Sequence, residues 1–144
     1  MNEVNWDECI SENSALSVSR DIKKSESLSK ISAGRIKFLE KQEINPESAS
    51  YIFEGFYTSA IEILHALIIN YGYKVSNHIC LGYYLRDKLK RNDLFNIFDD
   101  LRYKRNSIVY YGKEMEFEIA KKSIVDSKNL IKELNIILKG KLNQ

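Results

Sequence analysis

Most of the chain consists of stretches in which apolar residues recur every three or four positions, separated by short polar connections, and this pattern is typical of amphipathic helices. Glycine occurs six times, proline once, and strand-like alternation is scarce. The pattern predicts an all-α fold, an antiparallel bundle of four long helices plus shorter ones. The expected helices cover residues 6–11, 19–42, 46–70, 78–90, 93–110 and 114–139.

The second and third helices have clear start signals. Ser19 or Asp21 can cap the second helix. We expect its outer face to be rich in serine and its inner face to carry Leu28, Ile31, Ile36 and Leu39. Asn45 followed by Pro46 starts the third helix well, because asparagine caps the helix and proline at the first position loses no hydrogen bond.

The third helix is expected to be the most buried, because apolar residues cover more than half of its circumference. Its other side carries a candidate face for close packing, formed by Gly55, Ser59 and Ala66. Further along, Ser76 or Asn77 can cap the fourth helix and Gly112 can end the fifth. The last helix shows a heptad-like seam of Phe117, Ala120, Ile124, Ser127, Ile131, Leu134 and Leu138.

Length and composition fit one globular domain over residues 1–144, with residues 1–18 as a short N-terminal helix and extension. Hydrophobic residues make up 44% of the chain and charged residues 29%, as in ordinary globular proteins. The net charge of +2 is too small to indicate nucleic-acid binding by itself. Basic residues are concentrated between 86 and 105, where acidic residues partly offset them.

The sequence gives little sign of a membrane, a metal or a cofactor. No run of about 18 uncharged apolar residues occurs, and the N-terminus is acidic where a secretory signal is basic, so we expect a cytoplasmic protein. Cys9 and Cys80 have no spacing suited to zinc or to a disulfide framework, and we interpret both as packing residues. Because phosphate-loop and nucleophile motifs are absent, we expect no cofactor.

Arg105 does not fit the pattern of its helix. It lies near the middle of an apolar stripe made by Leu94, Ile97, Phe98, Leu101, Ile108 and Val109. Arginine stays charged in proteins, and an unpaired buried charge is costly. Three explanations are open: the head of Arg105 reaches solvent while its stem is buried, the stripe is a subunit interface that holds a site, or Arg105 pairs inside the bundle with Glu54, Glu62 or Asp87.

Polar residues beside Arg105 form a ridge on the same helix. Arg102, Asn106 and Tyr110 are spaced four apart and therefore share one face. They offer a guanidinium, an amide and a phenol, a combination that suits phosphate or ribose contacts. Because a tyrosine at a helix end more often packs than reacts, the ridge by itself does not define a site.

The pair Arg105 and Asn106, near the end of the penultimate helix, resembles the signature of HEPN domains, in which Arg, often followed by Asn, precedes a His by a few residues. Residues 20–138 are similar to prokaryotic HEPN proteins in helix order, in the tract GYKVSNHICLGYYL, and in LRYKRNSIVYYG before a long terminal helix. The resemblance implies a homodimer in which paired Arg and His residues cleave RNA without a metal. Some members are toxins partnered by a nucleotidyltransferase antitoxin.

The chain departs from this signature at one position, because Tyr110 stands where the His is expected. Metal-free RNA cleavage needs a group that takes the proton of the ribose 2′-hydroxyl. Imidazole titrates near neutral pH, whereas a phenol titrates at about 10. Tyr110 would therefore be a poor base, although it could still donate a hydrogen bond or stack on a base.

The resemblance therefore implies RNA or nucleotide binding in a toxin–antitoxin, defence or stress system. A degenerate ribonuclease site of Arg105, Asn106 and Tyr110 is expected at a homodimer interface, and Arg102, Arg105 and Tyr111 are the expected RNA- or nucleotide-binding residues. The alternative is a non-catalytic helical module that binds a nucleotidyltransferase or another protein.

The chain has two histidines, His65 and His78. His65 could supply an imidazole to the site from another helix or subunit, but a lone helical histidine is more often structural. His78 directly follows Ser76 and Asn77, and we interpret it as part of a helix start.

Overall fold

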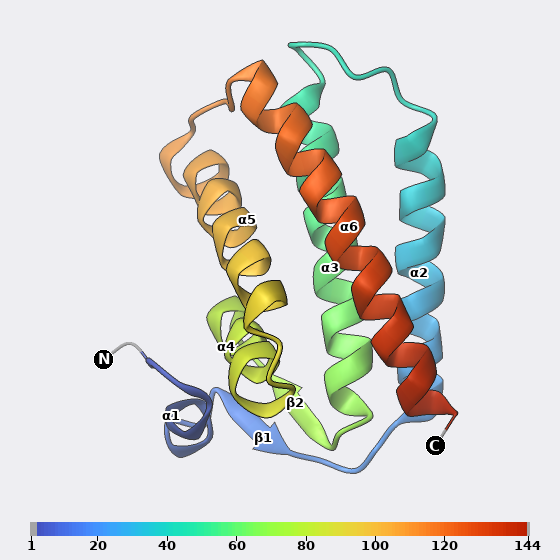
Figure 1. The fold of residues 1–144 in the computed structure, drawn as a ribbon, viewed down its shortest axis with the longest axis vertical. Coiled ribbons are helices and arrows are strands. Elements are labelled where there is room, and N and C mark those ends of the chain that lie inside the picture. The colour runs from blue at the N-terminus through green and yellow to red at the C-terminus, as the bar shows by residue number, and fades with distance from the viewer. Residues whose placement is uncertain (1–2, 144) are drawn as a thin grey trace.

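The computed structural model describes residues 3–143 and is mostly helical, which confirms the predicted all-α fold. The elements are α1 (Trp6–Ser11), β1 (Ala15–Ser17), α2 (Ile22–Glu40), α3 (Ala49–Ile69), β2 (Tyr73–Val75), α4 (His78–Tyr83), the π-helix η1 (Tyr84–Lys88), α5 (Asn92–Tyr111) and α6 (Phe117–Leu142). In Figure 1, α1, α4 and the two short strands gather at one end of the longer helices. The sequence pattern predicted the helices but not the strands.

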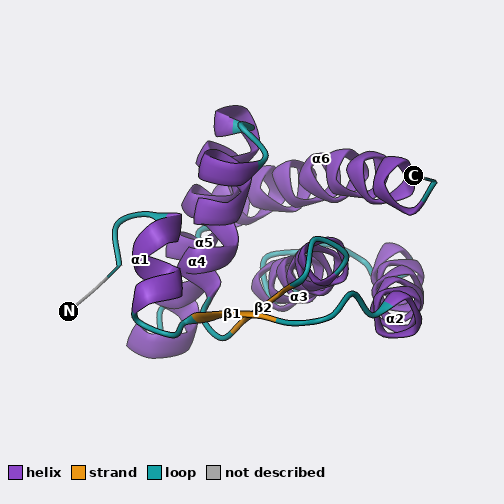
Figure 2. Ribbon diagram, turned by 90° about the horizontal axis from the view of Figure 1, so that it is seen from below, coloured by secondary structure: helices purple, strands orange, loops and turns teal. Residues whose placement is uncertain are grey.

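The central helix is α3, as predicted. Figures 1 and 2 show it between α2 and α6, with α4 and α5 on a further side. Its large apolar side chains are buried, among them Phe53, Phe56 and Leu64. By length and composition α3 could cross a membrane, but 72% of its most apolar window is buried inside the fold. The apolar surface of α3 is therefore covered by the neighbouring helices.

Two buried serines lie in the contact of α2 with α3. Ser25 and Ser32 are fully buried, and their hydroxyls donate to the backbone carbonyls of Ala66 at 2.9 Å and Ser59 at 3.0 Å. The prediction that serines lie on the outer face of α2 is wrong at these two positions, because small side chains let the helices approach closely. The prediction that Ile31 faces inward is also wrong, since this side chain is 53% exposed.

The predicted close-packing face of α3 meets α2 of the same chain. Ser59 and Ala66 are fully buried on this face. At Gly55, an added Cβ would lie only 2.7 Å from Cδ2 of Leu39. A larger residue at this position would have to displace the Leu39 side chain of α2, which packs directly against the α3 backbone.

Local hydrogen bonds set the ends of the helices. Asp21 and Asn77 cap α2 and α4 as predicted, each accepting at 2.9 Å from a backbone N–H three residues later. Asn45 closes a turn that contains Pro46, so α3 begins at residue 49, three residues later than predicted. Gly112 ends α5 with a φ of 63°, a left-handed conformation that favours glycine. The predicted seam of α6 is buried at Ala120, Ile124, Ser127, Ile131, Leu134 and Leu138.

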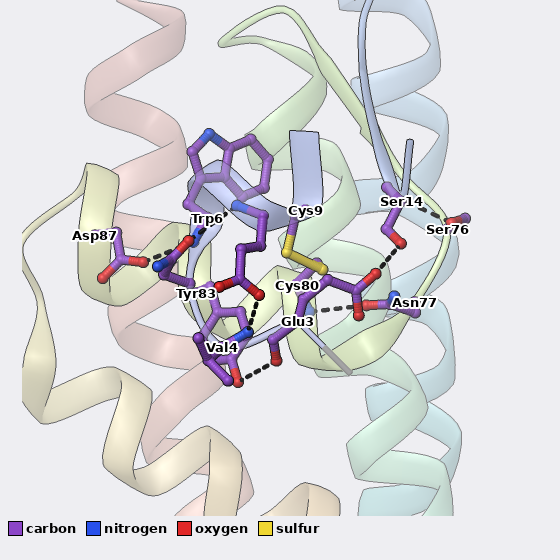
Figure 3. Close-up of a disulfide and its surroundings, with 12 residues drawn as sticks. Glu3, Val4, Trp6, Cys9, Ser14, Ser76, Asn77, Cys80, Tyr83 and Asp87 are labelled. Atoms are coloured by element: carbon purple, nitrogen blue, oxygen red, sulfur yellow. Dashed lines mark hydrogen bonds between the residues drawn. A yellow bond between two sulfur atoms is a disulfide. The ribbon is translucent and has the colours of Figure 1, made fainter. Parts of the chain in front are cut away.

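A disulfide bond joins Cys9 of α1 to Cys80 of α4, across a sequence separation of 71 residues (Figure 3). The interpretation of both cysteines as packing residues without a disulfide is therefore wrong. Both residues are completely buried. No local spacing connects two such distant cysteines, and only the folded chain brings them together.

Hydrogen bonds attach the rest of the N-terminal segment to α4 and η1. Strand β1 pairs antiparallel with β2, which leads directly into α4. The hydroxyl of Tyr83 donates to the carbonyl of Glu3 at 3.0 Å, and the backbone N–H of Trp6 donates to Asp87 at 2.8 Å (Figure 3). The disulfide and these contacts fix the position of α4 at this end of the fold.

Replacing Ser32 by Leu should lower the free energy of unfolding by about 1–3 kcal/mol, because the larger side chain would push α2 away from α3. Ser27 lies on the exposed side of the same helix and offers a matched control. Ser27→Leu should change the free energy by less than about 0.5 kcal/mol. Chemical denaturation followed by circular dichroism measures both variants. Equal effects would contradict the serine-lined contact.

Removing the disulfide by the double substitution Cys9→Ser and Cys80→Ser should lower the free energy of unfolding by about 2–4 kcal/mol. The physical reason is that the bond restricts a long loop of the unfolded chain. The oxidised protein and the double variant can be compared by the same denaturation experiment. An unchanged midpoint would show that the bond does not stabilise the fold.

Candidate functional site

The predicted polar ridge of α5 lines a pocket of about 460 Å³, and the first turn of α4 with the residues before it forms the opposite wall. We call this the α4–α5 pocket. It is lined by Ser76, Asn77, His78, Ile79, Arg102, Arg105, Asn106 and Tyr110. The predicted site residue Tyr111 lies outside it, 74% exposed at the end of α5. The structure thus brings together the other four residues predicted for the site.

Arg105 faces the α4–α5 pocket with its stem half-buried. Its guanidinium lies over the ring of Tyr57 on α3, with Cζ 5.7 Å from the ring centroid. Glu62 and Asp87, two of the three acids considered as partners, pair with other arginines at 2.9 Å and 2.7 Å. Within residues 3–143 none of the three acids forms an ion pair with Arg105, so the explanation by pairing inside the bundle is wrong.

Arg102 differs from Arg105 because an acid on its own helix partly compensates its charge. Its Nη2 lies 2.9 Å from Oδ1 of Asp99, three residues earlier in the chain. Half-exposed pairs of this kind contribute little to stability, but they hold a guanidinium in place. Both arginines line the pocket, but of the two only Arg102 forms an ion pair with a carboxylate among the described residues.

His78 brings to the pocket an imidazole that the sequence analysis did not assign to the site. It is the first residue of α4, which confirms its interpretation as part of a helix start. Its Nδ1 lies 2.9 Å from the hydroxyl of Tyr57. Tyr57 lies within the apolar surface of α3, and a buried tyrosine hydroxyl needs a hydrogen-bond partner. This requirement could have predicted a polar side chain near Tyr57, but not which one.

Burial and positive neighbours keep the imidazole of His78 uncharged. Burial, followed by the nearby Arg105, lowers the pKa of His78 to about 4. Burial also raises the pKa of Tyr57, so its hydroxyl keeps its proton at neutral pH. The α4–α5 pocket therefore combines permanent guanidinium charges with a neutral imidazole.

An adjoining pocket of about 430 Å³ extends the site toward the N-terminal segment. The two pockets share Asn77, Ile79 and Arg102. The second continues to Glu3 and Tyr83, which are joined by a hydrogen bond in Figure 3. Because they share these residues, the two pockets adjoin, and together they reach from α5 to the N-terminal segment.

His65 lies outside the α4–α5 pocket. It lines a smaller pocket of about 200 Å³ together with Lys24 and Lys74, and burial lowers its pKa. The same chain therefore does not bring this second imidazole to the ridge of α5. Among the residues that the structure describes, no three His, Cys, Asp or Glu side chains are grouped as metal ligands.

The protein should lose stability as the pH falls from about 6.5 to 4. In this range the unfolded His78, with an ordinary pKa of 6.5, binds a proton that the folded form, with a pKa of about 4, does not. Protonation therefore favours the unfolded chain, and the free energy of unfolding decreases as the pH falls. His78→Gln should flatten this dependence in denaturation curves, and His65→Gln measures the separate contribution of His65. An NMR titration midpoint of His78 above 6 would contradict this prediction.

Comparisons of the chain with protein-family models, curated proteins and solved structures found no match. The resemblance to HEPN domains accordingly rests on the motif in α5 and on the order of the helices.

Proposed function

We propose that the chain binds RNA or a nucleotide through a phosphate group held in the α4–α5 pocket. The observation that supports this proposal is the convergence of Arg102, Arg105, Asn106 and His78 on one pocket. A guanidinium can donate two parallel hydrogen bonds to a phosphate. The amide and the imidazole can add further hydrogen bonds. Phosphate contacts supply much of the affinity in nucleic-acid binding.

Exposed tyrosines on α5 favour a ligand that contains bases. Tyr103, Tyr110 and Tyr111 are 71%, 70% and 74% exposed. Tyrosine rings on a protein surface can stack on bases of single-stranded nucleic acid. Tyr110 also lines the α4–α5 pocket, so one ligand could contact its ring and the neighbouring guanidinium groups. The adjoining pocket gives room for a second nucleotide.

Ribonuclease activity without a metal is the catalytic form of this proposal. The reaction needs a group that takes the proton of the 2′-hydroxyl and a group that protonates the leaving oxygen. Arg105 and Asn106 match the signature of HEPN domains, and Tyr110 replaces its histidine. His78 is the one imidazole among the described residues that line the pocket. Cleavage would therefore depend on whether His78 can accept a proton.

We also propose a HEPN-like assembly, in which α2, α3, α5 and α6 form an antiparallel bundle and two copies meet through the end of α5. Val109, Tyr110 and Tyr111 expose large side chains there, as protein interfaces commonly do. The same exposed residues favour the alternative function, a non-catalytic module that binds a nucleotidyltransferase or another protein. For the HEPN-like homodimer, the proposed partner is a nucleotidyltransferase antitoxin, within a toxin–antitoxin, defence or stress system.

A cytoplasmic location remains part of this proposal. Disulfides persist mainly in oxidising compartments, so the bond between Cys9 and Cys80 weighs against it. Rapid alkylation of thiols in intact cells, followed by mass spectrometry, would show whether the two cysteines are paired where the protein acts.

Arg105→Ala should weaken the binding of single-stranded RNA by about 10–100-fold, because a charged hydrogen-bond donor is lost from the pocket. Arg91→Ala removes the same charge elsewhere, from an arginine that pairs with Asp93 and Glu133, and should leave the affinity nearly unchanged. Fluorescence anisotropy in the presence of a chelator measures binding, and gel analysis of the same samples measures cleavage.

The outcomes separate the parts of the proposal. Binding that is lost in Arg105→Ala supports the pocket, and cleavage lost in the same variant supports the ribonuclease. A wild-type protein that binds neither RNA nor nucleotides contradicts the proposed function and favours the interaction module. Sedimentation of a monomer at micromolar concentration contradicts the homodimer.

A further inference from the structure

We propose that Tyr57 is a positioning residue of the α4–α5 pocket, which holds His78 in the tautomer with its proton on Nε2 and so makes this imidazole a hydrogen-bond donor to an anionic ligand. The role toward a ligand rests on the proposed function. The tautomer of His78 can be measured without any ligand, so an experiment can contradict the proposed function and leave the tautomer intact, or the reverse.

Tyr57 contacts both residues that carry the chemistry of the pocket. It comes from α3 and is only 1% exposed. One ring face stacks on Phe98 of α5, with an interplanar angle of 9° and 6.1 Å between centroids. The guanidinium of Arg105 lies 5.7 Å from the ring centroid, and the hydroxyl lies 2.9 Å from Nδ1 of His78. A side chain fixed in the core thus sets the position of both an imidazole and a guanidinium.

The direction of the hydrogen bond follows from the partners of the Tyr57 hydroxyl. Within the described residues, Nδ1 of His78 is its hydrogen-bond partner. If Nδ1 carried the proton and donated it, the phenol proton would have no acceptor among these residues, and an unsatisfied buried donor is unfavourable. A bond donated from the hydroxyl to Nδ1 satisfies both groups. The proton of the neutral imidazole then lies on Nε2.

The groups around His78 oppose a second proton on the imidazole. Arg102, Arg105 and Tyr110 face it from α5, while Tyr57 and His65 are its titratable neighbours on α3. These groups are either positively charged or neutral, and no carboxylate is among the residues that line the pocket. His78 is thus held neutral, with Nδ1 already occupied as an acceptor.

The consequence for the pocket is that it presents hydrogen-bond donors to its ligand. Arg105 donates from its guanidinium, and His78 donates from Nε2. A donor on Nε2 can bind a phosphate oxygen but cannot take the proton of a 2′-hydroxyl. The arrangement therefore favours binding of a phosphodiester over its cleavage.

The tautomer can be tested by NMR on ¹⁵N-labelled protein at pH 7, because long-range proton–nitrogen correlations distinguish a protonated Nε2 from a protonated Nδ1. In the wild type, the proton of His78 should lie on Nε2. Tyr57→Phe keeps the ring that stacks on Phe98 but removes the hydroxyl, and should give a mixture of tautomers. Tyr84→Phe, at another buried tyrosine outside the pocket, should leave the His78 signals unchanged.

The effect of Tyr57 on ligand binding can be tested with a short oligouridylate as the probe. Tyr57→Phe should weaken its binding about twofold, because in a mixture of tautomers only about half of the His78 rings carry the proton on Nε2, and Tyr84→Phe should leave the affinity unchanged. A wild-type His78 with its proton on Nδ1 overturns the inference, as does an unchanged tautomer in Tyr57→Phe. Because the wild-type spectrum needs no variant, the inference stays testable even if Tyr57→Phe does not fold. Failure of the wild type to bind oligouridylate, other RNA and nucleotides overturns the proposed function, while the spectrum still decides the tautomer.

Discussion

The structure depends on covering α3. This helix is apolar around most of its circumference, so it has to be enclosed by several neighbours rather than by one. Two kinds of contact achieve this. Toward α2, buried serines bring the two backbones close together. Toward α5, the rings of Tyr57 and Phe98 stack in the core. The stacking of Tyr57 on Phe98 therefore sets the distance between α3 and α5, and with it the position of the polar ridge of α5.

The polar end of Tyr57 connects this packing to the candidate site. A phenol in the core needs a hydrogen-bond partner, because an unpaired buried polar group is unfavourable. The first residue of α4 meets this need through Nδ1 of His78. The disulfide at Cys80 and the cap at Asn77 hold the same turn of α4 in place. The packing of the core and the formation of the α4–α5 pocket therefore use the same residues.

The sequence predicted features that depend on local spacing. Helix positions follow from periodicity, and Arg102, Asn106 and Tyr110 share a face because they are four residues apart. Features that depend on contacts between distant segments were missed. Periodicity treats Ser32 as polar and therefore exposed, although its hydroxyl is satisfied by a carbonyl of the neighbouring helix. Likewise, the place of His78 beside α5 follows from how α4 is docked, which no local pattern encodes.

The bond between Cys9 and Cys80 also closes a covalent ring, which contains α2 and α3, whereas α5 and α6 lie outside it. Mechanical tension between the two ends of the chain would pass through the two sulfur atoms and bypass the ring. The tension would therefore act on the segments outside the ring, before Cys9 and after Cys80, and the second of these carries α5 and Arg105. The residues inside the ring, Tyr57 and His78 among them, would remain shielded from the force.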